Sequence, residues 1–309
     1  LIHHGTVEQK QRYIQNILTA DEIWCQLFSE PGSGSDLASL RTRADIRDGH
    51  FVVNGQKVWT SLGYAADWGV LLARTDANVP KYNGISYILL DMHSPGVEVR
   101  PLKQITGSAE FCEVFFTDVR APRENLIGQL NQGWQIAQTT LSYERGGSLL
   151  GRVVRAQVLF AQLVKTVKRM EEQGVLADHD PLVRQKLGRI CVDMEVLRYN
   201  GLRILSRHQK GNRPGPESSI DKLYRSEFDQ RFQALAQEIL GPYGQLSDGL
   251  PPEFVDDGDD QRRVETWAFR FLASKAGTIA AGTSEVQRNI IGERVLGLPK
   301  EPRADRVKK

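Results

Sequence analysis

The sequence predicts an α+β fold in which a strand-rich segment is followed by a bundle of long helices. Short apolar runs separated by turn residues fill the chain from Trp24 to about Ile127. Long stretches with helical periodicity follow Gly133. Strands and helices that are grouped along the chain, and that do not alternate, are typical of α+β proteins.

The first predicted element is a helix of mixed charge over Glu8–Leu18. The chain starts with Leu1, not methionine, and enters this helix directly, so we expect an N-terminal segment to be missing. Strand-like runs follow, and the breaks between them carry turn residues such as Asp48-Gly49, Asn54-Gly55 and Pro95-Gly96. Their spacing predicts an antiparallel sandwich or barrel with strands at Phe51–Asn54, Trp68–Ala73, Ile85–Asp91, Val97–Val99 and Glu113–Phe116.

The remaining chain predicts an antiparallel helix bundle, because four long helical stretches are followed by a fifth that is interrupted at Ala281-Gly282-Thr283. The segment Gly241–Asp260 is rich in Gly, Pro and Asp and is predicted to be an exposed linker. The helices are expected at Trp134–Leu150, Arg152–Glu172, Pro181–Gln209, Ser219–Leu240 and Trp267–Val295.

Composition and charge restrict the function. The chain has 309 residues, of which 40% are hydrophobic and 25% charged, which suits a globular protein of two domains. A net charge of +2 argues against nucleic acid and membrane surfaces as partners. No apolar run approaches the roughly 20 residues of a membrane span. Cys25, Cys112 and Cys191 lack metal-ligand or redox spacing, so we expect buried, reduced cysteines, no metal site and a cytoplasmic location.

Two motifs carry most of the functional information. Ser29-Glu-Pro-Gly-Ser-Gly-Ser-Asp36 is a glycine-rich turn flanked by hydroxyls, and Asn54-Gly-Gln-Lys-Val-Trp-Thr-Ser61 is predicted to be a hairpin. Glycines allow close approach of the backbone to a ligand, and backbone N–H groups in such turns bind anions. Trp59 offers a flat face, while Ser29, Thr60 and Ser61 offer hydrogen bonds. The pair suits a planar heteroaromatic ring with a phosphate tail, although each motif alone also occurs as an ordinary turn.

Together with further stretches, these motifs resemble the acyl-CoA dehydrogenase family of flavoenzymes, in particular the bacterial branch with fatty-acid and sterol side-chain dehydrogenases. The resemblance implies the end of a mostly missing N-terminal helical domain at 1–22, a middle β-domain at 23–130 and a C-terminal bundle at 131–309. The matching stretches are Ile23–Asp36, Asn54–Ser61, Gly84–Tyr87, Ser94–Val97, Ala109–Phe111, Tyr143–Gly146 and Ala281–Pro299.

The resemblance also implies FAD as the cofactor. Trp59 should cover one face of the isoalloxazine, and Ser61 should hydrogen-bond near N5, where a donor stabilises the charge that grows as hydride arrives. Ser35 should approach the pyrophosphate and the substrate. The remaining expected cofactor contacts are Gln26, Leu27, Phe28 and Ser29 along the flavin ring, Thr283 and Glu285 after the helix break, and Glu238 and Gly241 in a glycine turn that meets the cofactor of a neighbouring subunit.

Two features depart from the family pattern on that neighbouring-subunit side. Glu238 stands where a glutamine is common, and a carboxylate would repel a pyrophosphate. The Arg-x-Phe-Gly motif of many members is absent from the second bundle helix, where Phe160-Ala-Gln-Leu stands instead. This half of the cofactor site is therefore altered, or is supplied by a different partner chain.

The reaction of the family needs a carboxylate base in an apolar pocket, because burial raises the pKa of the carboxyl toward the working pH. Many members place it just before the Gly-Thr of the last helix break, where this chain has Ala281. Members resembling the isovaleryl and long-chain types place it before an arginine on the first bundle helix, which gives Glu144 before Arg145. We predict Glu144 as the base and Tyr143 and Arg145 at the substrate; the alternative is a solvated Glu-Arg pair.

Three functions follow from the resemblance. The first is an FAD-dependent acyl-CoA dehydrogenase of lipid metabolism that passes electrons to an electron-transfer flavoprotein, as a homo- or hetero-tetramer. The second is an oxidase or monooxygenase of the same fold. The third is one subunit of a heteromeric dehydrogenase with a partial cofactor site. Glu144 favours the first, because a monooxygenase needs no base for an α-proton.

Overall fold

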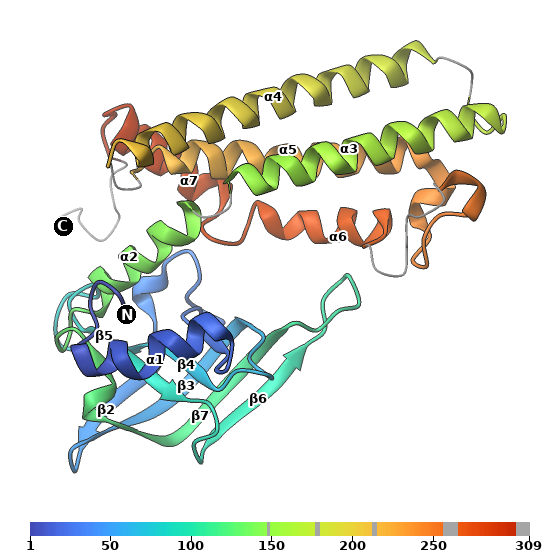
Figure 1. The fold of residues 1–309 in the computed structure, drawn as a ribbon. Helices are drawn as coiled ribbons and strands as arrows, with labels where there is room; N and C mark the ends of the chain where they lie inside the picture. The colour runs from blue at the N-terminus through green and yellow to red at the C-terminus, as the bar shows by residue number, and fades with distance from the viewer. Residues whose placement is uncertain (147–148, 177–179, 212–214, 256–264, 301–309) are drawn as a thin grey trace, which may run out of the picture. The chain divides into compact units, whose positions relative to one another are not determined.

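The computed structural model describes residues 1–146, 149–176, 180–211, 215–255 and 265–300, apart from the side chains of residues 144–150 and of His208. The chain divides into two compact units, Leu1–Leu141 and Ser142–Lys309. Strands dominate the first unit and helices the second (Figure 1), which confirms the predicted α+β class. We refer to them as the β unit and the helical unit.

An eight-stranded sheet forms the β unit. Its strand order is β6-β7-β3-β2-β4-β5-β8, with β1 on β4. The pairs are antiparallel, as expected, except for β1–β4 and β2–β4, which are parallel. The strands are β1 (Trp24–Leu27), β2 (Arg43–Arg47), β3 (His50–Ser61), β4 (Trp68–Arg74), β5 (Ile85–Asp91), β6 (Val97–Leu102), β7 (Phe111–Pro122) and β8 (Leu126–Ile127).

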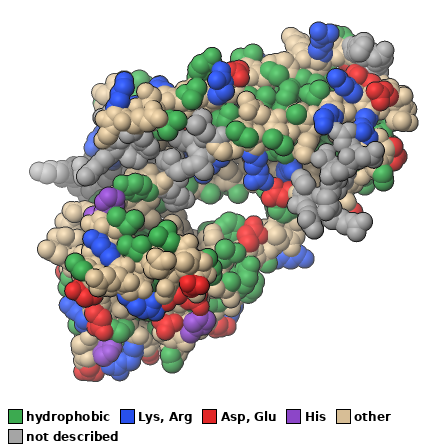
Figure 2. Space-filling model, viewed as in Figure 1, with side chains coloured by type: hydrophobic (Ala, Val, Ile, Leu, Met, Phe, Trp, Pro, Cys, Tyr) green, Lys and Arg blue, Asp and Glu red, His purple; other side chains and the backbone are tan. Residues whose placement is uncertain are grey.

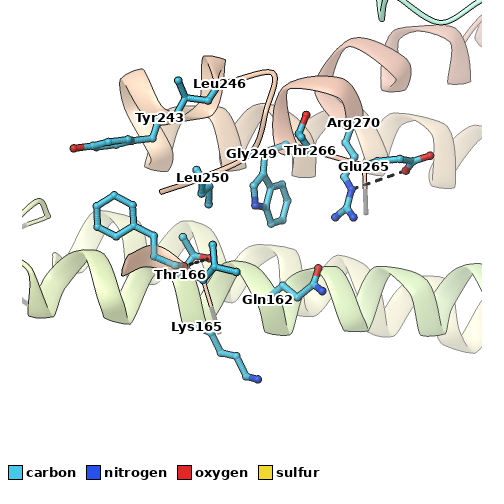
Figure 3. A pocket seen from close by; sticks show the side chains of 13 residues that line it. Gln162, Lys165, Thr166, Tyr243, Leu246, Gly249, Leu250, Glu265, Thr266 and Arg270 are labelled. Carbon is cyan, nitrogen blue, oxygen red and sulfur yellow. Dashed lines mark hydrogen bonds and ion pairs between the residues drawn. The ribbon is translucent and has the colours of Figure 1, made fainter. Parts of the chain in front are cut away.

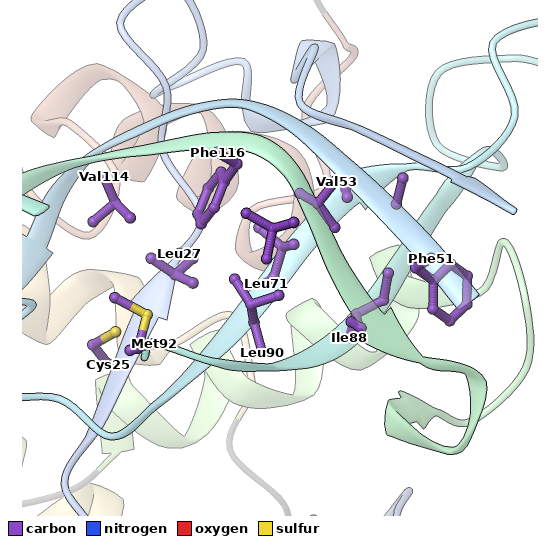
Figure 4. Close-up of a cluster of buried hydrophobic side chains, with 14 of the residues drawn as sticks. Cys25, Leu27, Phe51, Val53, Leu71, Ile88, Leu90, Met92, Val114 and Phe116 are labelled. Atoms are coloured by element: carbon purple, nitrogen blue, oxygen red, sulfur yellow. The ribbon is translucent and has the colours of Figure 1, made fainter. Parts of the chain in front are cut away.

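Both faces of the central strands are buried. Successive strand residues point to opposite faces, so Leu71 of β4 joins one apolar cluster and Leu72 joins the other. The first cluster draws side chains from β1 to β5 and from β7, as Figure 4 shows for Leu27, Val53 and Leu90. Helix α1 (Val7–Thr19) and the start of α2 (Gly133–Gly146) supply Tyr13, Ile136 and Ala137 to the second.

Asn54-Gly55 in the β unit and Cys191 in the helical unit differ from the sequence-based expectations. Asn54-Gly55 is not a turn, because β3 runs through it and the Asn54 side chain holds Asp118 of β7 through two hydrogen bonds. Gly55 is needed for close approach: a Cβ atom there would lie 2.5 Å from Thr42 Oγ1. Cys25 and Cys112 are buried as expected, but Cys191 is exposed on α4 (Pro181–Gln209).

Helix α5 (Ser218–Leu240) is the central element of the helical unit. It contacts α3 (Leu149–Glu172), α4, α6 (Trp267–Gly277) and α7 (Ser284–Ile290). Phe228 and Phe232 of α5 stack on each other, and Trp267 of α6 meets Phe232 edge-on. Short 3₁₀ turns at Gly241–Gln245 and Pro252–Phe254 follow α5, and a π-helical turn at Ile291–Val295 follows α7. The predicted interruption near Ala281 separates α6 from α7.

Some apolar side chains of the helical unit face outward. Val154 and Val158 of α3, and Val192 and Val196 of α4, are exposed and lie four positions apart on their helices, so each pair shares one face. Figure 2 shows hydrophobic side chains among Lys and Arg on this unit. Across the described ranges, none of the helices combines the length and apolar character of a membrane span.

Gly133 is the point at which α2 begins against β5. A Cβ atom there would lie 2.4 Å from the carbonyl carbon of Ser86 and 2.6 Å from the backbone nitrogen of Tyr87. We therefore expect Gly133→Ala to lower the free energy of unfolding by roughly 1–3 kcal/mol. Gly151→Ala is the matched control, because a Cβ at this helical position meets nothing and alanine gains about 1 kcal/mol over glycine. Urea unfolding of both variants should show a lower free energy of unfolding for Gly133→Ala and a higher one for Gly151→Ala. Equal changes in the two variants would contradict the close approach at Gly133.

Candidate active site

Trp59 is presented to solvent by a bulge in β3. Between the pairs Lys57–Val114 and Thr60–Cys112, β3 holds one more residue than β7, which defines a β-bulge. Trp59 there has φ of 62°, a left-handed conformation that costs a bulky residue roughly 1–3 kcal/mol. Its side chain remains 57% exposed, and its ring meets Phe111 edge-on at 6.1 Å. A strained, exposed tryptophan is therefore held on the surface of an otherwise buried strand.

A buried ion pair lies directly before this bulge. The Lys57 side chain has no exposed surface, and its Nζ donates hydrogen bonds to Glu30 Oε1 and to the carbonyl of Phe28, each at 2.9 Å. The Glu30 carboxylate also accepts the backbone N–H groups of Arg41 and Thr42 at 2.7 and 2.9 Å. The pair thus joins the Phe28–Glu30 segment, the Arg41–Thr42 segment and β3.

The pKa values of this pair follow from burial and contact. Burial would raise the pKa of Glu30, but Lys57 and the two backbone N–H groups together hold it below its ordinary value. Burial lowers the pKa of Lys57 to about 8, against the attraction of Glu30. The fold therefore favours the ionised form of Glu30, whose carboxylate is paired with Lys57 and accepts two backbone hydrogen bonds.

The ion pair and a backbone hydrogen bond set the Ser29 loop beside the bulge. Val58 N–H donates to the Ser29 carbonyl at 2.9 Å. Beyond Ser29 the chain turns tightly, because Glu30 and Ser33 exchange two backbone hydrogen bonds. Ser35, on the far side of this turn, is exposed. The structure therefore brings Ser29 next to the segment that carries Trp59 and Ser61.

The predicted site residues of the β unit differ in what they can offer a ligand. Gln26 and Ser61 are exposed and Ser29 is half-buried, whereas the side chains of Leu27 and Phe28 are buried in the core and leave only backbone groups. Thr60 does not present a hydroxyl, contrary to expectation. It alternates with Trp59 and Ser61 along the strand, so it points inward and is fully buried.

The second group of predicted residues lies at the break between α6 and α7. Ala281 has φ of 54° and Gly282 has φ of 89°, so two successive residues leave the helical conformation. Two buried side chains hold them: Lys222 Nζ of α5 donates to the Gly282 carbonyl at 2.6 Å, and Gln287 Nε2 donates to the carbonyls of Ala281 and Gly282, each at 3.1 Å. Burial lowers the pKa of Lys222.

Thr283 and Glu285 follow this break and line one open cleft. Thr283 caps α7 by accepting a hydrogen bond from Val286 N–H. The cleft has a volume of about 720 Å³ and is lined by the cations Arg231, Lys275 and Arg288 and by the carboxylates of Glu227 and Glu285. Arg288 is ion-paired with Glu227. Glu285 is exposed, and its pKa is lowered by its own backbone N–H and by the Thr283 hydroxyl. The cleft can accept an anionic ligand against its cations.

Glu238 and Gly241 lie at the other end of α5. Glu238 forms an ion pair with Lys186 of α4, which neutralises the carboxylate that the sequence pattern identified as repulsive. About sixteen residues, or roughly 24 Å of helix, separate Glu238 from Lys222. Tyr243, just beyond, lines a cavity of about 60 Å³ shown in Figure 3, which has room for a few water molecules but is too small for a nucleotide. The two predicted cofactor segments of the helical unit are therefore well separated.

Glu144 and Arg145 belong to the last turn of α2, but their side chains lie outside the described residues. Tyr143, one position earlier, is 50% exposed. Sequence reasoning missed Glu30, Lys57, Lys222 and Gln287. Polar and charged side chains are by default expected in solvent, and the partners of the three charged residues stand far away in the chain.

Family models match both units. The C-terminal domain of acyl-CoA dehydrogenase matches residues 131–296, and the middle domain of acyl-CoA dehydrogenase matches residues 25–119. The chain is 38% identical over 307 residues to acyl-CoA dehydrogenase IpdE1 of Mycobacterium tuberculosis, which covers 97% of this chain and 73% of that protein. It is 39% identical over 300 residues to acyl-CoA dehydrogenase FadE34 of the same organism, over 97% of this chain and 38% of that protein.

Solved structures agree with the family models. A protein described as the Tcur3481-Tcur3483 steroid ACAD superposes with a TM-score of 0.85 at 29% identity, over 97% of this chain and 74% of that chain. The ChsE4-ChsE5 complex from Mycobacterium tuberculosis gives a TM-score of 0.80 at 30% identity, over 97% of this chain and 75% of that chain. The arrangement of strands and helices is thus shared with these dehydrogenases.

We expect Glu30→Gln to lower the free energy of unfolding by roughly 3–5 kcal/mol, because it leaves the buried Lys57 charge uncompensated. The folded-state pKa of Glu30 lies below its ordinary value of 4.5, so the charge stabilises the fold above that pH and the gain is lost as pH falls through the folded-state pKa. The difference in the free energy of unfolding between wild type and Glu30→Gln should therefore become smaller at acidic pH.

Urea unfolding followed by tryptophan fluorescence checks this, because four of the five tryptophans lie in the β unit. Asp45→Asn is the control, since it breaks the exposed Arg47–Asp45 pair and should cost at most about 1 kcal/mol. If Glu30→Gln lowers the free energy of unfolding as little as Asp45→Asn does, the Glu30–Lys57 pair does not stabilise the fold as described.

Proposed function

The chain belongs to the acyl-CoA dehydrogenase family of flavin-dependent oxidoreductases, and we propose that it converts an acyl-CoA thioester to its trans-2-enoyl-CoA. The observation that carries the proposal is the strained, exposed Trp59 beside Ser61 and the Ser29 loop. When bound there, FAD would supply the acceptor for the β-hydride. Every other part of the reaction falls to this chain's own residues.

The residues of the β unit fit a flavin. Trp59 offers an exposed ring, oriented by Phe111, on which a planar heterocycle can stack. Ser61 is exposed on the same side of β3 and can donate a hydrogen bond at the position where negative charge develops. Gln26, Ser29 and the backbone of Leu27 and Phe28 would contact the ring, and Ser35 the pyrophosphate and substrate. The ion pair of Glu30 and Lys57 would keep these groups in register.

Glu144 would act as the base that takes the α-proton. Ala281 occupies the other location that the family uses, and a methyl group cannot accept a proton. Tyr143 and Arg145 flank Glu144, and we propose that they contact the substrate near the thioester. A general base is most effective when its pKa lies near the working pH.

The helical unit would contribute to two cofactor sites. Thr283 and Glu285 line the cationic cleft at the helix break, whereas Glu238 and Gly241 lie roughly 24 Å away along α5. This separation supports a role for Glu238 and Gly241 at the cofactor of a neighbouring subunit. Lys186 neutralises Glu238 and so removes the main objection to that role.

The substrate and partners follow from the relatives. One structure with 29% identity is described as a steroid ACAD, so we propose a ring-bearing, steroid-derived acyl group in preference to a simple fatty acid. The apolar faces of α3 and α4 at Val154, Val158, Val192 and Val196 support assembly with further subunits. We propose a tetramer of like or unlike chains that passes electrons to an electron-transfer flavoprotein.

One alternative is retained because a specific observation favours it. The ChsE4-ChsE5 structure is a complex of two different chains, and the Arg-x-Phe-Gly motif is absent here. The chain would then be one subunit of a heteromeric enzyme and would complete its cofactor site only with its partner. The flavin content per chain, measured for the chain alone and after co-expression with a dehydrogenase partner, distinguishes the two.

The reaction itself is tested by mixing the flavin-loaded protein with acyl-CoAs in the absence of oxygen. The proposal predicts loss of the oxidised flavin absorbance with a saturated acyl-CoA and no loss with the matching trans-2-enoyl-CoA. An oxidase would regenerate the absorbance rapidly when air is admitted. Absence of bleaching with short, long and steroid acyl-CoAs alike would refute the dehydrogenase.

We expect Glu144→Gln to keep its flavin and its fold but to reduce the rate of flavin bleaching by about 10²–10⁴-fold, because the α-proton loses its acceptor. Stopped-flow absorbance measures the rate. Glu195→Gln is the control, because Glu195 pairs with Arg198 on the surface of α4, and its rate should match wild type. A wild-type rate in Glu144→Gln would assign the base elsewhere.

Ser61→Ala tests the hydrogen bond at the flavin. Removal of one donor that faces developing charge typically costs about 10²-fold in rate, so the variant should bind FAD almost normally yet bleach slowly. Ser247→Ala, in an exposed loop of the helical unit, is the matched control. If the flavin of Ser61→Ala is reduced as fast as that of the control and of wild type, the Ser61 hydroxyl does not assist the reaction.

A further inference from the structure

A charged cavity lies among α3, α5 and α6, apart from the predicted cofactor residues. Its volume is about 340 Å³, within the range of small-ligand sites. The polar part of its lining comprises Arg152, Arg155, Arg225, Arg270, Asp221, Asp229, Glu265 and Gln233. Apolar side chains such as Leu159, Phe228 and Phe232 complete it. The lining is therefore an apolar wall that carries an unusual number of charges.

The charges of the cavity do not balance. Among the described residues of the lining, four arginines face three carboxylates, which leaves one excess positive charge. Arg155 and Glu265 form a short hydrogen bond at 2.6 Å. The other two pairs are long, with Arg225 Nε 3.8 Å from Asp221 and Arg270 Nε 3.9 Å from Glu265, the latter drawn in Figure 3. Distances above 3.6 Å are not hydrogen bonds.

Buried hydrogen-bond donors without partners show that the cavity lacks acceptors. Among the described residues, the Nε donors of Arg225 and Arg270 are buried without a hydrogen-bond partner. Arg270 as a whole is only 9% exposed, so bulk water does not satisfy its donor. Burial lowers the pKa of both Arg225 and Arg270. An unsatisfied buried guanidinium is costly, and a bound carboxylate would supply the missing acceptors in the geometry that arginine prefers.

The elements around the cavity also lead to the proposed reaction site. On α5, Asp221 lines the cavity and the next residue, Lys222, holds the Gly282 carbonyl at the helix break. Helix α6 carries Arg270 and Ser274 in the lining and then runs to that same break. Arg152 stands in the first turn of α3, eight positions after Glu144 in the chain. Two helices that line the cavity thus also carry residues at or next to the break.

From these observations we infer that the acyl group of the substrate carries a carboxylate at the end remote from the thioester, and that this cavity binds it. The inference rests on the proposed acyl-CoA function. One carboxylate neutralises the excess positive charge of the lining, and its oxygens accept hydrogen bonds from Arg225 and Arg270. The apolar wall accommodates the carbon chain or ring that bears the carboxylate.

Equilibrium binding tests this without turnover. Trans-2-enoyl-CoAs with a terminal carboxylate are titrated into the flavin-loaded protein and compared with methyl-ended compounds of the same length, at eight, ten and twelve carbons. Calorimetry should show at least about tenfold tighter binding of the carboxylate at one or more lengths. Equal affinity at every length would overturn the inference.

Variants locate the preference in the cavity. Arg225→Gln and the milder Arg152→Gln, a half-buried residue, should bring the affinity ratio of the two compounds close to one while the methyl-ended compound keeps its affinity. A merely structural effect would weaken both compounds equally. Arg198→Gln on the outer face of α4 is the control and should leave the ratio unchanged. An unchanged ratio in both cavity variants would also overturn the inference.

This result is separate from that of the anaerobic bleaching experiment. If no acyl-CoA bleaches the flavin, the dehydrogenase function fails, and the affinity ratio still decides whether the cavity binds a carboxylate. If an acyl-CoA bleaches the flavin but both compounds bind with equal affinity, the dehydrogenase function is supported and the inference that the cavity binds a carboxylate is overturned.

Discussion

The buried ion pair between Lys57 and Glu30 is the constraint on which the proposed flavin platform depends. A lysine without exposed surface is tolerated only where its charge is paired and its hydrogen bonds are made. Here the acceptors are the Glu30 carboxylate and the Phe28 carbonyl, and Glu30 in turn receives the backbone of Arg41 and Thr42. Two segments that are distant in sequence, Phe28–Glu30 and Arg41–Thr42, are thereby fixed to β3 immediately before Trp59. The strained conformation of Trp59 persists because its surroundings leave it no alternative.

The helical unit uses the same device at the break between α6 and α7. Lys222 and Gln287 are buried, and they donate to carbonyls that the interrupted helices leave unpaired. In both units, then, a buried lysine bonds to backbone carbonyls next to the residues expected at the cofactor. Dehydrogenase chemistry needs the cofactor contacts and the base to be held firmly. The hydrogen bonds of these buried lysines hold backbone segments in place without belonging to either apolar core.

Much of the fold could be predicted from the sequence because it follows from periodicity. The helix Pro181–Gln209 and the interruption at Ala281 were visible as pattern, and strands with two buried faces appeared as continuous apolar runs. Residues whose role depends on distant partners were not predictable. Asn54-Gly55 has the composition of a turn, yet Asn54 binds Asp118 and Gly55 makes room for Thr42. Thr60 seemed equivalent to Ser61 in the sequence, but alternation along β3 places their side chains on opposite faces.

The site was predictable only in part for the same reason. Resemblance to a family led us to predict Trp59, Ser61 and Glu144 as site residues, whereas the buried pair beside the first two was overlooked because its members look like ordinary surface charges. The charged cavity could not be foreseen either, since its arginines come from three helices. What the sequence lacks in each case is the environment that decides whether a charge is solvated or buried.

The most direct test of this account is the FAD dissociation constant of a chain in which the pair is made neutral, Glu30→Gln with Lys57→Met. Replacement of a buried pair by neutral groups of similar size spares the fold far more than removal of one partner does. The account predicts a folded β unit with FAD affinity reduced by at least about tenfold, because the Ser29 loop and Trp59 lose their common anchor. A folded variant that binds FAD as tightly as wild type would contradict it.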